Sequence, residues 1–497
     1  MNIEPIETKL EPNIQKRLYN ANLWWQSIPR LPLPPFKRWA FEPVLNRLKG
    51  GITPIVGLRG PRQVGKTTLT QQIIQQLLDE GVPAHHILHV LFDDLPTFTA
   101  QQEPILEISY WFEEQILGKP FNVVAHEGMR VYLFFDELQN IPYWAPQLKY
   151  LVDLNSVRVM ITGSSALQIE MGRESLVGRL STIEMGPLFL REIAALRGFG
   201  EVPSLLPFNG LGRLKAQSFW QDLRDFGQQY QEVREMAFAA FSERGAYPIA
   251  HLSAEMPWEE LANQLNESII HRVIHHDSRM GEKGLQRDVQ LLEEIFRLSC
   301  RYIGQAPGQK LYLDEIQRSI NSNIDWQNIL NYLRFLDRSL LLRLIAPLEL
   351  RLKRQHGAGK LCLCDHALRA SWLQEIVPLT ETELSKHPHL SGLAGHIAES
   401  AAGYFISSLS GLGVAHFPER KTEPEIDFIL TVGDQRIPVE VKYRKKIDFA
   451  DIRGLLSFIE RPFYRAPFGL LITQTESIKI NLPRIVQIPL STFLLMR

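Results

Sequence analysis

Two sets of residues in this 497-residue chain have the types and spacing needed for phosphate chemistry, one near each end. Between Gly60 and Thr67 the sequence fits the phosphate-binding P-loop pattern at every fixed position. Near the other end, Asp427 precedes Glu440 and Lys442, which joins two potential metal-binding carboxylates to a lysine that could act at a scissile phosphate. Both chemistries in one chain imply that ATP turnover governs an action on nucleic acid.

The P-loop pattern lies in the sequence context that its chemistry requires. Residues 55–58 predict a buried strand, and the apolar residues after the loop keep helical spacing as far as Gly81. A strand, a glycine-containing loop and a helix N-terminus turn backbone N–H groups towards phosphates, so a chance match is the weaker interpretation. Lys66 would contact the β- and γ-phosphates of ATP, and the Thr67 hydroxyl would hold Mg²⁺. The predicted nucleotide-binding residues are Gly60, Pro61, Arg62, Gln63, Val64, Gly65, Lys66, Thr67 and Thr68.

Two acids, Asp136 and Glu137, directly follow the apolar run of residues 131–135. The Mg²⁺ shell beside a P-loop needs a carboxylate at the carboxyl end of a buried strand, which suits Asp136 as a metal ligand. Glu137 could polarise the attacking water as a catalytic residue. Two acids at a strand end could also form a solvated loop, but the apolar run before them favours the functional interpretation.

Two further positions could complete the ATPase site. Residues 157–161 predict a strand that leads into small hydroxylated residues, and Ser164 among them could hydrogen-bond to the γ-phosphate. The same residues could instead form a turn and a helix cap. Arg179 is a candidate arginine finger, a catalytic residue that would act across a homo-oligomer of the ATPase core. A plain surface arginine is an equally open interpretation of this residue.

These motifs resemble those of the prokaryotic AAA+ ATPases that carry a C-terminal domain of unknown function. The resemblance rests on Gly-Pro-Arg-Gln-Val-Gly-Lys-Thr-Thr, the Phe-Asp-Glu strand end, Thr-Gly-Ser-Ser, a later Gly-Arg and Tyr247-Pro248. It extends with gaps from about residue 50 over most of the chain, although residues 28–36 and 198–231 depart from the pattern. It implies a P-loop sheet with the AAA+ strand order, a winged-helix middle and a nuclease-like end.

Asp427 and Glu440 are predicted to face each other across a β-hairpin. Glu440 and Lys442 are two residues apart in a candidate strand, so both side chains leave the same face. Gly433-Asp434 suits a two-residue turn with glycine first, and that turn would place Asp427 directly opposite Glu440. Like charges in such a pair are destabilising unless something neutralises them. A divalent metal ion between the two carboxylates is the natural remedy.

Glu399 adds a third carboxylate from a preceding helix, on a stripe of small residues that permits close packing against the sheet. Together, these acids and the lysine resemble the PD-(D/E)xK nuclease superfamily. The resemblance implies that the acids bind Mg²⁺ and that the lysine positions or activates water. The open alternative is a binding fold whose acids and lysine form a buried salt-bridged network. The implied catalytic residues are Glu399, Asp427, Glu440 and Lys442, with Asp427 and Glu440 as metal ligands.

The middle of the chain predicts a winged helix. Asp325 caps a helix that begins at Trp326, and a strand, a basic loop and a second strand at residues 361–364 follow it. The polar face of that helix carries amide and guanidinium groups that can read base edges or hold phosphates, so we expect DNA contact here. A solvated face of a packing module is the equal alternative. The polar face comprises Gln327, Asn331, Arg334 and Arg338, and the basic loop comprises Arg351, Lys353, Arg354, His356 and Lys360.

Composition narrows the class of protein. With 45% apolar and 22% charged residues the chain reads as soluble and globular, and its net charge of −1 means that nucleic acid must be bound by local basic patches. No apolar run approaches the roughly 20 residues that span a bilayer, and residues 1–10 do not resemble a signal peptide. Three cysteines cannot form a disulfide framework. We therefore expect a cytoplasmic protein with no membrane contact.

The expected fold class is a multidomain α/β protein, since the chain is too long for one core. In the favoured interpretation, ATP and Mg²⁺ turnover controls a nucleic-acid-binding, metal-dependent nuclease domain. The competing interpretation is an ATP-driven switch whose nuclease-like domain is an inert docking module for a protein partner. The predicted domains are an N-terminal extension (1–48), an AAA+ P-loop ATPase core (49–205), a helical lid or linker (206–290), a winged helix (291–375) and a restriction-endonuclease-like α/β domain (385–497).

Overall fold

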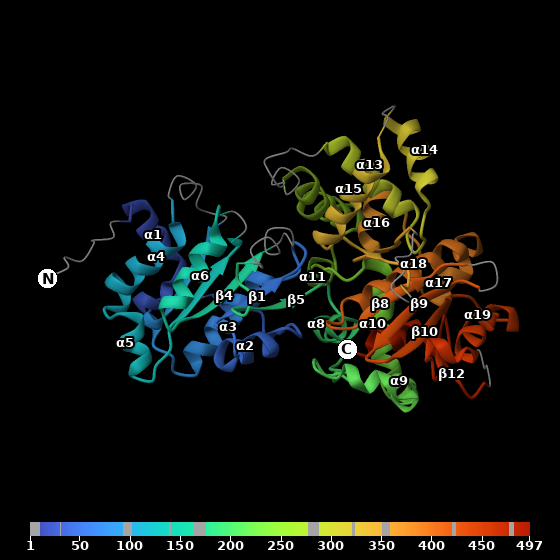
Figure 1. Cartoon of the computed structure of the whole chain (residues 1–497), viewed down its shortest axis with the longest axis horizontal. Helices are drawn as coiled ribbons and strands as arrows, with labels where there is room; N and C mark the ends of the chain where they lie inside the picture. The colour runs from blue at the N-terminus through green and yellow to red at the C-terminus, as the bar shows by residue number, and fades with distance from the viewer. Residues whose placement is uncertain are drawn as a thin grey trace. The chain divides into compact units, whose positions relative to one another are not determined.

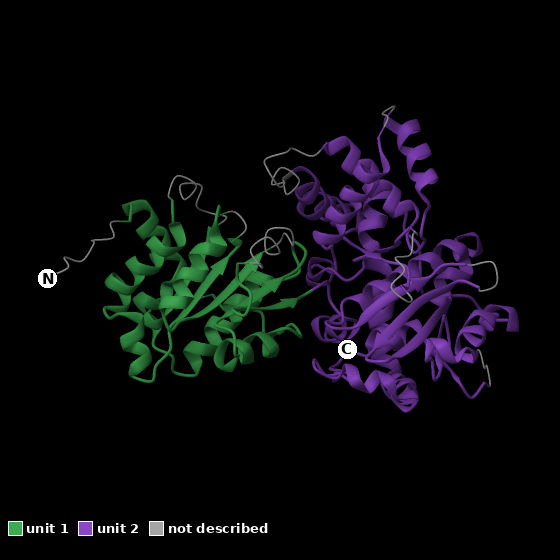
Figure 2. Ribbon diagram, in the orientation of Figure 1, with its two compact units in different colours: residues 1–185 green, residues 186–497 purple. Residues whose placement is uncertain are grey.

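A computed structural model of the chain separates into two compact units, residues 1–185 and residues 186–497 (Figure 2). Among the described helices, none is both long and apolar enough to cross a bilayer. The described residues are 10–29, 31–92, 102–138, 141–163, 175–276, 288–320, 324–349, 358–419, 424–476 and 482–497.

The first unit ends at Met185, earlier than the boundary predicted at residue 205. The helix α8 (Leu190–Leu196) accounts for the difference, because it packs against α10 (Gln231–Arg244) and α20 (Leu490–Leu495) of the second unit. The segments predicted as lid, winged helix and nuclease-like domain all lie within this second compact unit.

A five-stranded parallel sheet forms the centre of the first unit. Its order, β2-β3-β4-β1-β5, is the AAA+ order that the resemblance implied, and it places β4 between the P-loop strand and the strand that ends in the acids. The strands predicted at residues 55–58, 131–135 and 157–161 are confirmed, whereas β5 was not predicted. The strands are β1 (Ile55–Arg59), β2 (Ile87–Leu91), β3 (Tyr132–Asp136), β4 (Arg158–Gly163) and β5 (Leu180–Glu184).

Helices cover both faces of this sheet, as Figure 1 shows. The helices α2 (Phe41–Gly50) and α3 (Lys66–Asp79) lie on one face, and α1 (Pro12–Ala21), α4 (Pro104–Phe112) and α6 (Trp144–Leu154) lie on the other. Strands that are covered on both faces must be apolar throughout, which explains their continuous hydrophobic runs. The shorter helices are η1 (Leu23–Gln26), η2 (Ala84–His86), η5 (Glu113–Leu117) and α5 (Phe121–His126).

The segment before the ATPase core closes one edge of the sheet. Edge strands such as β2 expose backbone N–H and C=O groups that need partners. The Asn22 side chain imitates a neighbouring strand, because its amide donates to the His89 carbonyl (2.8 Å) and its oxygen accepts from the His89 N–H (2.7 Å). The indole N–H groups of Trp24 and Trp25 both donate to the Ile87 carbonyl, at 3.1 and 2.9 Å. The predicted N-terminal extension is therefore part of the ATPase fold.

The helices predicted as a lid pack inside the second unit. The helix α9 (Gln217–Gln229) lies against α20, and its Trp220 stacks on Phe493 with ring centroids 6.2 Å apart. Arg234 of α10 is buried and donates to the Thr492 hydroxyl at 2.6 Å. These contacts place the helices in the second compact unit. The other elements of this region are η7 (Leu211–Lys215), α11 (Pro248–Leu252), α12 (Trp258–Leu265) and η8 (Asn266–His276).

Three helices and a two-stranded antiparallel sheet follow. The last two helices and the two strands come in the predicted order, whereas the first helix was not predicted. Asp325 caps the third helix as predicted, since its carboxylate accepts from the Asn328 N–H at 2.8 Å. The loop at residues 350–357 lies outside the described residues. The elements are α13 (Val289–Arg301), α14 (Gln309–Ile320), α15 (Trp326–Arg338), β6 (Leu342–Ile345) and β7 (Lys360–Leu363), followed by α16 (His366–Leu373) and α17 (Glu381–Lys386).

A second five-stranded sheet, of order β12-β11-β10-β9-β8, forms the C-terminal part of the second unit. The pairs β8–β9 and β9–β10 are antiparallel, whereas β10–β11 and β11–β12 are parallel. The strands are β8 (Gly413–Phe417), β9 (Ile426–Val432), β10 (Gln435–Lys442), β11 (Gly469–Thr473) and β12 (Ile485–Pro489). The accompanying helices are η11 (Pro388–Leu390), α18 (Ser391–Ser407), α19 (Phe449–Glu460) and η12 (Pro462–Tyr464).

The hairpin register predicted for β9 and β10 is confirmed. Val432 pairs with Gln435 across the turn, and the ladder continues without a shift to Phe428 and Val439. Gly433 has a φ of 62°, which a turn with glycine at its first central position requires. The observed pairing ends at Phe428 and Val439, one position before the two predicted acids.

Candidate functional site

The P-loop joins β1 to α3 in the arrangement that the sequence predicted. Gly65 has a φ of 94°, and a Cβ atom at Gly60 would lie 2.1 Å from the Met185 carbonyl oxygen, so both positions need glycine. Lys66 is buried, and its ammonium donates to the carbonyl oxygens of Gly60 (3.0 Å) and Pro61 (2.9 Å). The backbone of the loop thus holds the lysine ammonium beside the N-terminus of α3.

The other predicted nucleotide contacts differ in exposure. Arg38, from the segment before the core, donates to the Val64 carbonyl and supports the loop. Exposed hydroxyls in the first turn of α3 stand beside N–H groups that have no partner within the helix, which is where phosphates bind. The buried residues are Pro61, Arg62 and Val64, and the exposed ones are Gln63, Thr67 and Thr68.

Asp136 and Glu137 are held together by Thr162 at the end of β4. The Thr162 hydroxyl donates to the Asp136 carboxylate and accepts from the Glu137 N–H at 3.2 Å. Glu137 has a φ of 54°, an uncommon conformation for a residue other than glycine, and this contact stabilises it. Thr67 lies near enough to Asp136 to lower the pKa of its carboxyl, so the two predicted Mg²⁺ ligands are neighbours. Thr162 is one of the small hydroxylated residues predicted after residues 157–161, but its contact with the two acids was not predicted, because it depends on β4 lying beside β3.

The residues at Asp136 fit a bound Mg²⁺ ion. Burial raises the pKa of Asp136 and the charge of Glu137 adds to the shift, although hydrogen bonds from Thr162 and Thr67 oppose it. Its second oxygen, Oδ2, is buried and has no hydrogen-bond partner among the described residues. A buried carboxylate oxygen in that state suits a cation. With Thr67 and Asp136 as ligands, bound Mg²⁺ would neutralise charge on the β- and γ-phosphates of ATP.

Arg179 lies at the end of the sheet opposite its own P-loop. Its carbonyl accepts from the Ile55 N–H (3.0 Å) at the start of β1, whereas the P-loop follows the other end of that strand. A five-residue strand separates the two by about 13 Å. Its guanidinium pairs with Asp153 at 2.9 Å. Arg179 therefore lies away from the P-loop of its own chain. Ser164 lies outside the described residues.

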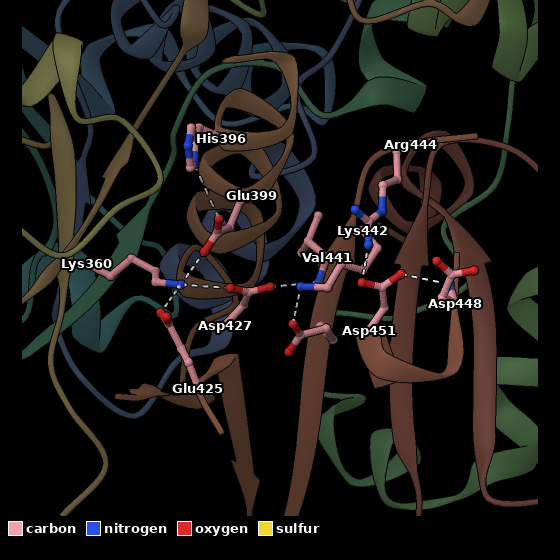
Figure 3. A network of polar contacts seen from close by, with 11 residues as sticks. Lys360, His396, Glu399, Glu425, Asp427, Val441, Lys442, Arg444, Asp448 and Asp451 are labelled. Carbon is pink, nitrogen blue, oxygen red and sulfur yellow. Dashed lines mark hydrogen bonds and ion pairs between the residues drawn. The ribbon is translucent and has the colours of Figure 1, made fainter. Parts of the chain in front are cut away.

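In the second unit, three carboxylates converge on one lysine (Figure 3). The Lys360 ammonium contacts the carboxylates of Glu399, Asp427 (3.0 Å) and Glu425 (3.5 Å). The other oxygen of Asp427 accepts from the Val441 N–H at 2.8 Å. Glu399 and Asp427 thus meet as predicted, but the lysine that joins them was not among the predicted site residues.

The position of Lys360 corrects the interpretation of the basic loop. Lys360 is 1% exposed, at the first position of β7, and so cannot contact DNA there. Docking of β7 on α18 explains this burial, since the Leu363 N–H donates to the Ser400 hydroxyl at 2.9 Å. Gly403 also permits close approach, because a Cβ atom there would lie 2.5 Å from the Cys362 sulfur. The other basic-loop residues, which lie outside the described part of the chain, are Arg351, Lys353, Arg354 and His356.

Glu440 and Lys442 form an ion pair on β10, as expected for residues on one face of a strand. Glu440 is 6% exposed, and its Oε2 atom has no hydrogen-bond partner within the described structure. Burial, reinforced by the charge of Asp427, raises the pKa of Glu440 to about 8. The expected repulsion between Asp427 and Glu440 is therefore present. Lys442 and Lys360 oppose it, since both lower the pKa of Glu440.

The carboxylate cluster, defined here as Glu399, Asp427 and Glu440, does not fit a divalent metal ion in this arrangement. Both oxygens of Asp427 already accept hydrogen bonds, and one of them faces Lys360. Burial alone would lower the pKa of Lys360, but the neighbouring acids raise it well above its ordinary value, so the ammonium stays charged. The cluster is thus neutralised by lysines where the sequence suggested a metal ion.

The predicted polar face of α15 is exposed to solvent. Gln327 donates to the Asn331 side chain at 3.2 Å, which aligns two amides along the helix. The exposed face thus presents amides and guanidinium groups together, and such groups can contact base edges and phosphates. The exposed residues are Gln327, Asn331, Arg334 and Arg338, and the buried residues behind them are Ile329, Leu333, Phe335 and Leu336.

Comparisons with known proteins match two segments of the chain. Residues 53–194 match the family model described as an AAA domain, and residues 395–493 match one described as a domain of unknown function (DUF4143). The uncharacterized protein Rv2008c of Mycobacterium tuberculosis is 30% identical over 145 residues, which cover 29% of this chain and 27% of that protein. The uncharacterized protein MJ1637 of Methanocaldococcus jannaschii is 25% identical over 250 residues, which cover 49% and 47%.

The matched part spans between about a quarter and a half of the length of these relatives. A solved structure, that of C. elegans PCH-2, aligns with 49% of this chain and 62% of its own at 13% identity, and its TM-score of 0.25 is too low to carry an argument. The AAA-domain match agrees with the P-loop and the strand order found above. Residues 53–194 therefore form a P-loop domain of the AAA ATPase type.

Proposed function

We propose that this chain is an ATP-binding and ATP-hydrolysing switch whose nucleotide cycle controls a nucleic-acid-binding second unit. The observation that carries the ATPase half is the contact of Thr162 with both Asp136 and Glu137, because it holds the proposed metal ligand beside the proposed catalytic glutamate. The exposed face of α15 supports the nucleic-acid half, with DNA as the first candidate.

Replacing Arg334 and Arg338 with alanine should weaken DNA binding and lower the slope of its salt dependence by about two, one for each lost phosphate contact. Stability should hardly change, because both side chains are exposed. Fluorescence anisotropy of a labelled duplex over a salt series measures the affinity and the slope together.

A matched control removes the same charge elsewhere in the second unit. Arg224 of α9 and Lys386 of α17 are exposed, and their double replacement with alanine should leave DNA binding unchanged. If both double variants lose the same amount of DNA affinity, the α15 face does not bind DNA and is simply an exposed helix surface.

The same assay tests control by nucleotide. The Glu137→Gln variant with ATP should differ in DNA affinity from the parent protein with ADP by about 5-fold or more, the lower end of typical coupling. Identical affinities in the ATP, ADP and nucleotide-free states would contradict the proposed switch.

Arg179 supports a proposal of assembly through the ATPase core. Arg179→Ala should lower ATP turnover on the order of 10³-fold without lowering ATP affinity. Mixing it with Lys66→Ala should restore phosphate release, because one subunit then supplies the arginine and its neighbour supplies the P-loop. Parental activity in Arg179→Ala alone would leave this residue as the partner of Asp153 only.

A metal-dependent nuclease is the second candidate function of the second unit. It is supported by Asp427 and Glu440 on neighbouring strands of a mixed sheet with Lys442 beside them. Cleavage of DNA or RNA with Mg²⁺ or Mn²⁺, with and without ATP, tests it, and Lys442→Ala should abolish the activity. The alternative is an inert docking module for a protein partner. Lys360 favours that alternative, and absence of cleavage under every condition would support it.

A further inference from the structure

Burying a lysine ammonium costs free energy of folding, because the ammonium loses its hydration in the interior. Neighbouring carboxylates can offset this cost. Lys360 meets that cost with three carboxylates, those of Glu399, Glu425 and Asp427. It belongs to β7, whereas the carboxylate cluster is carried by α18, β9 and β10, so the ammonium arrives from a separate part of the unit (Figure 3). The Lys360 ammonium therefore supplies the positive charge that a bound metal ion would supply at this site.

We propose that the Lys360 ammonium is the resident cation of the carboxylate cluster and that a divalent metal ion binds there only after Lys360 leaves. If the second unit is a nuclease, as in the second candidate function above, the site could not bind its metal ion while β7 is docked. This consequence rests on that proposed function. The occupancy itself concerns cation binding and can be measured without any cleavage.

The two cations exclude each other because they need the same oxygen. The Lys360 ammonium lies 3.0 Å from Asp427 Oδ1. A Mg²⁺ or Mn²⁺ ion at about 2.1 Å from that oxygen would lie roughly 4 Å from the ammonium, where three positive charges repel strongly with little water between them. Asp427 Oδ2 is less available to a metal ion, because one of its lone pairs already accepts from the Val441 N–H.

Removal of the lysine would leave a site with metal-binding chemistry. The cluster would keep its three carboxylates, and Glu440 Oε2 already has no hydrogen-bond partner within the described structure. Carboxylate oxygens are the ligands that Mg²⁺ and Mn²⁺ prefer. A variant without the ammonium should therefore take up a divalent ion where the parent protein takes up none.

The backbone around Lys360 keeps the ammonium at the cluster. The next residue, Leu361, donates to the Gln305 carbonyl at 2.8 Å and accepts from the Gly304 N–H at 2.7 Å. Together with the bond from Leu363 to Ser400, these contacts tie β7 on both sides. The state with Lys360 at the carboxylate cluster is consequently the resting state of the second unit.

Binding of Mn²⁺, followed without nucleotide by its electron paramagnetic resonance signal and by thermal unfolding, tests the proposal. The parent protein and its Asp427→Asn variant should bind Mn²⁺ equally. In both proteins Lys360 blocks the carboxylate cluster, so any Mn²⁺ that binds does so at other sites, which the variant leaves unchanged. Lys360→Ala should gain one site that binds at least 10-fold more tightly and raises the melting temperature. Adding Asp427→Asn to Lys360→Ala should remove that gain. Lys386→Ala, which removes an exposed lysine, should behave as the parent protein does.

Two outcomes would overturn the proposal. One is Mn²⁺ binding by the parent protein that Asp427→Asn removes, and this needs no variant of Lys360. The other is a folded Lys360→Ala protein, or Lys360→Met if the alanine variant does not fold, that gains no site dependent on Asp427. A gained metal site without cleavage of nucleic acid would instead contradict the nuclease candidate and leave the proposal standing.

Discussion

Glu137→Gln should bind ATP with the affinity of the parent protein and hydrolyse it at least about 100-fold more slowly. The amide keeps the shape of the carboxylate but cannot polarise the attacking water, and the Thr162 contact to the backbone of residue 137 is retained. Lys66→Ala should instead lose ATP binding, because it removes the charge that faces the phosphates. Equilibrium binding of a fluorescent ATP analogue and phosphate-release kinetics separate the two effects.

Glu127→Gln is the matched control for this experiment. Glu127 is an exposed glutamate of the same unit, paired with Lys119, so its replacement should leave turnover at the parental rate. Parental turnover in Glu137→Gln would mean that another group orients the attacking water.

Asp427→Asn should destabilise the second unit by about 3 kcal/mol, the lower end of the range for breaking a buried ion pair. Repulsion from Glu440, argued from the sequence alone, would make the asparagine variant at least as stable as the parent in metal-free buffer. Lys360 reverses the expected sign, because the amide leaves a buried ammonium with one charged partner fewer. Denaturant unfolding in metal-free buffer measures the difference.

The loss of stability should depend on pH. Burial would raise the pKa of Asp427, but Lys360 outweighs it and holds the pKa below its ordinary value. An acid with a lowered folded-state pKa contributes stability above its unfolded pKa of about 3.9 and loses that contribution as the pH falls towards the folded value. The difference in stability between parent and variant should therefore begin to shrink below about pH 4 and should keep shrinking as the pH falls towards the folded-state pKa.

Asp434→Asn provides the control for the same hairpin. Asp434 is exposed and pairs with Lys215 at 3.2 Å, so water screens the pair and its loss should hardly change the free energy of unfolding. A drop as large as that of Asp427→Asn would show that the hairpin, and not the buried lysine, determines the effect.

Chemistry encoded in consecutive residues could be predicted from the sequence. The P-loop around Lys66 and the acids after β3 each occupy a few adjacent positions with a strand signal before them. The β9–β10 register followed from a two-residue turn, because Gly433 sets the phase of every later pair. Local patterns were therefore enough to predict most of the ATPase site and two of the three acids of the carboxylate cluster.

Contacts between distant segments could not be predicted. Lys360 looked like one more basic residue of a loop, and its burial depends on β7 docking against a helix whose Glu399 lies 39 residues later. Thr162 becomes a site residue only because β4 is the neighbour of β3 in the sheet. In the same way, the limits of the compact units depend on α8, whose packing partners come from much later in the chain.

The hydrogen bonds of the Asn22 side chain to the edge of β2 matter for the choice of fragment in work on the isolated ATPase domain. A fragment starting at residue 49, where the sequence suggested a boundary, would lack Asn22, Trp24 and Trp25 and would leave the outer side of β2 without cover. A bare, apolar edge strand pairs readily with a second copy of itself. Oligomers of such a fragment would then form by pairing of exposed edge strands. They could be mistaken for a ring of ATPase subunits, although nucleotide would have no part in their assembly.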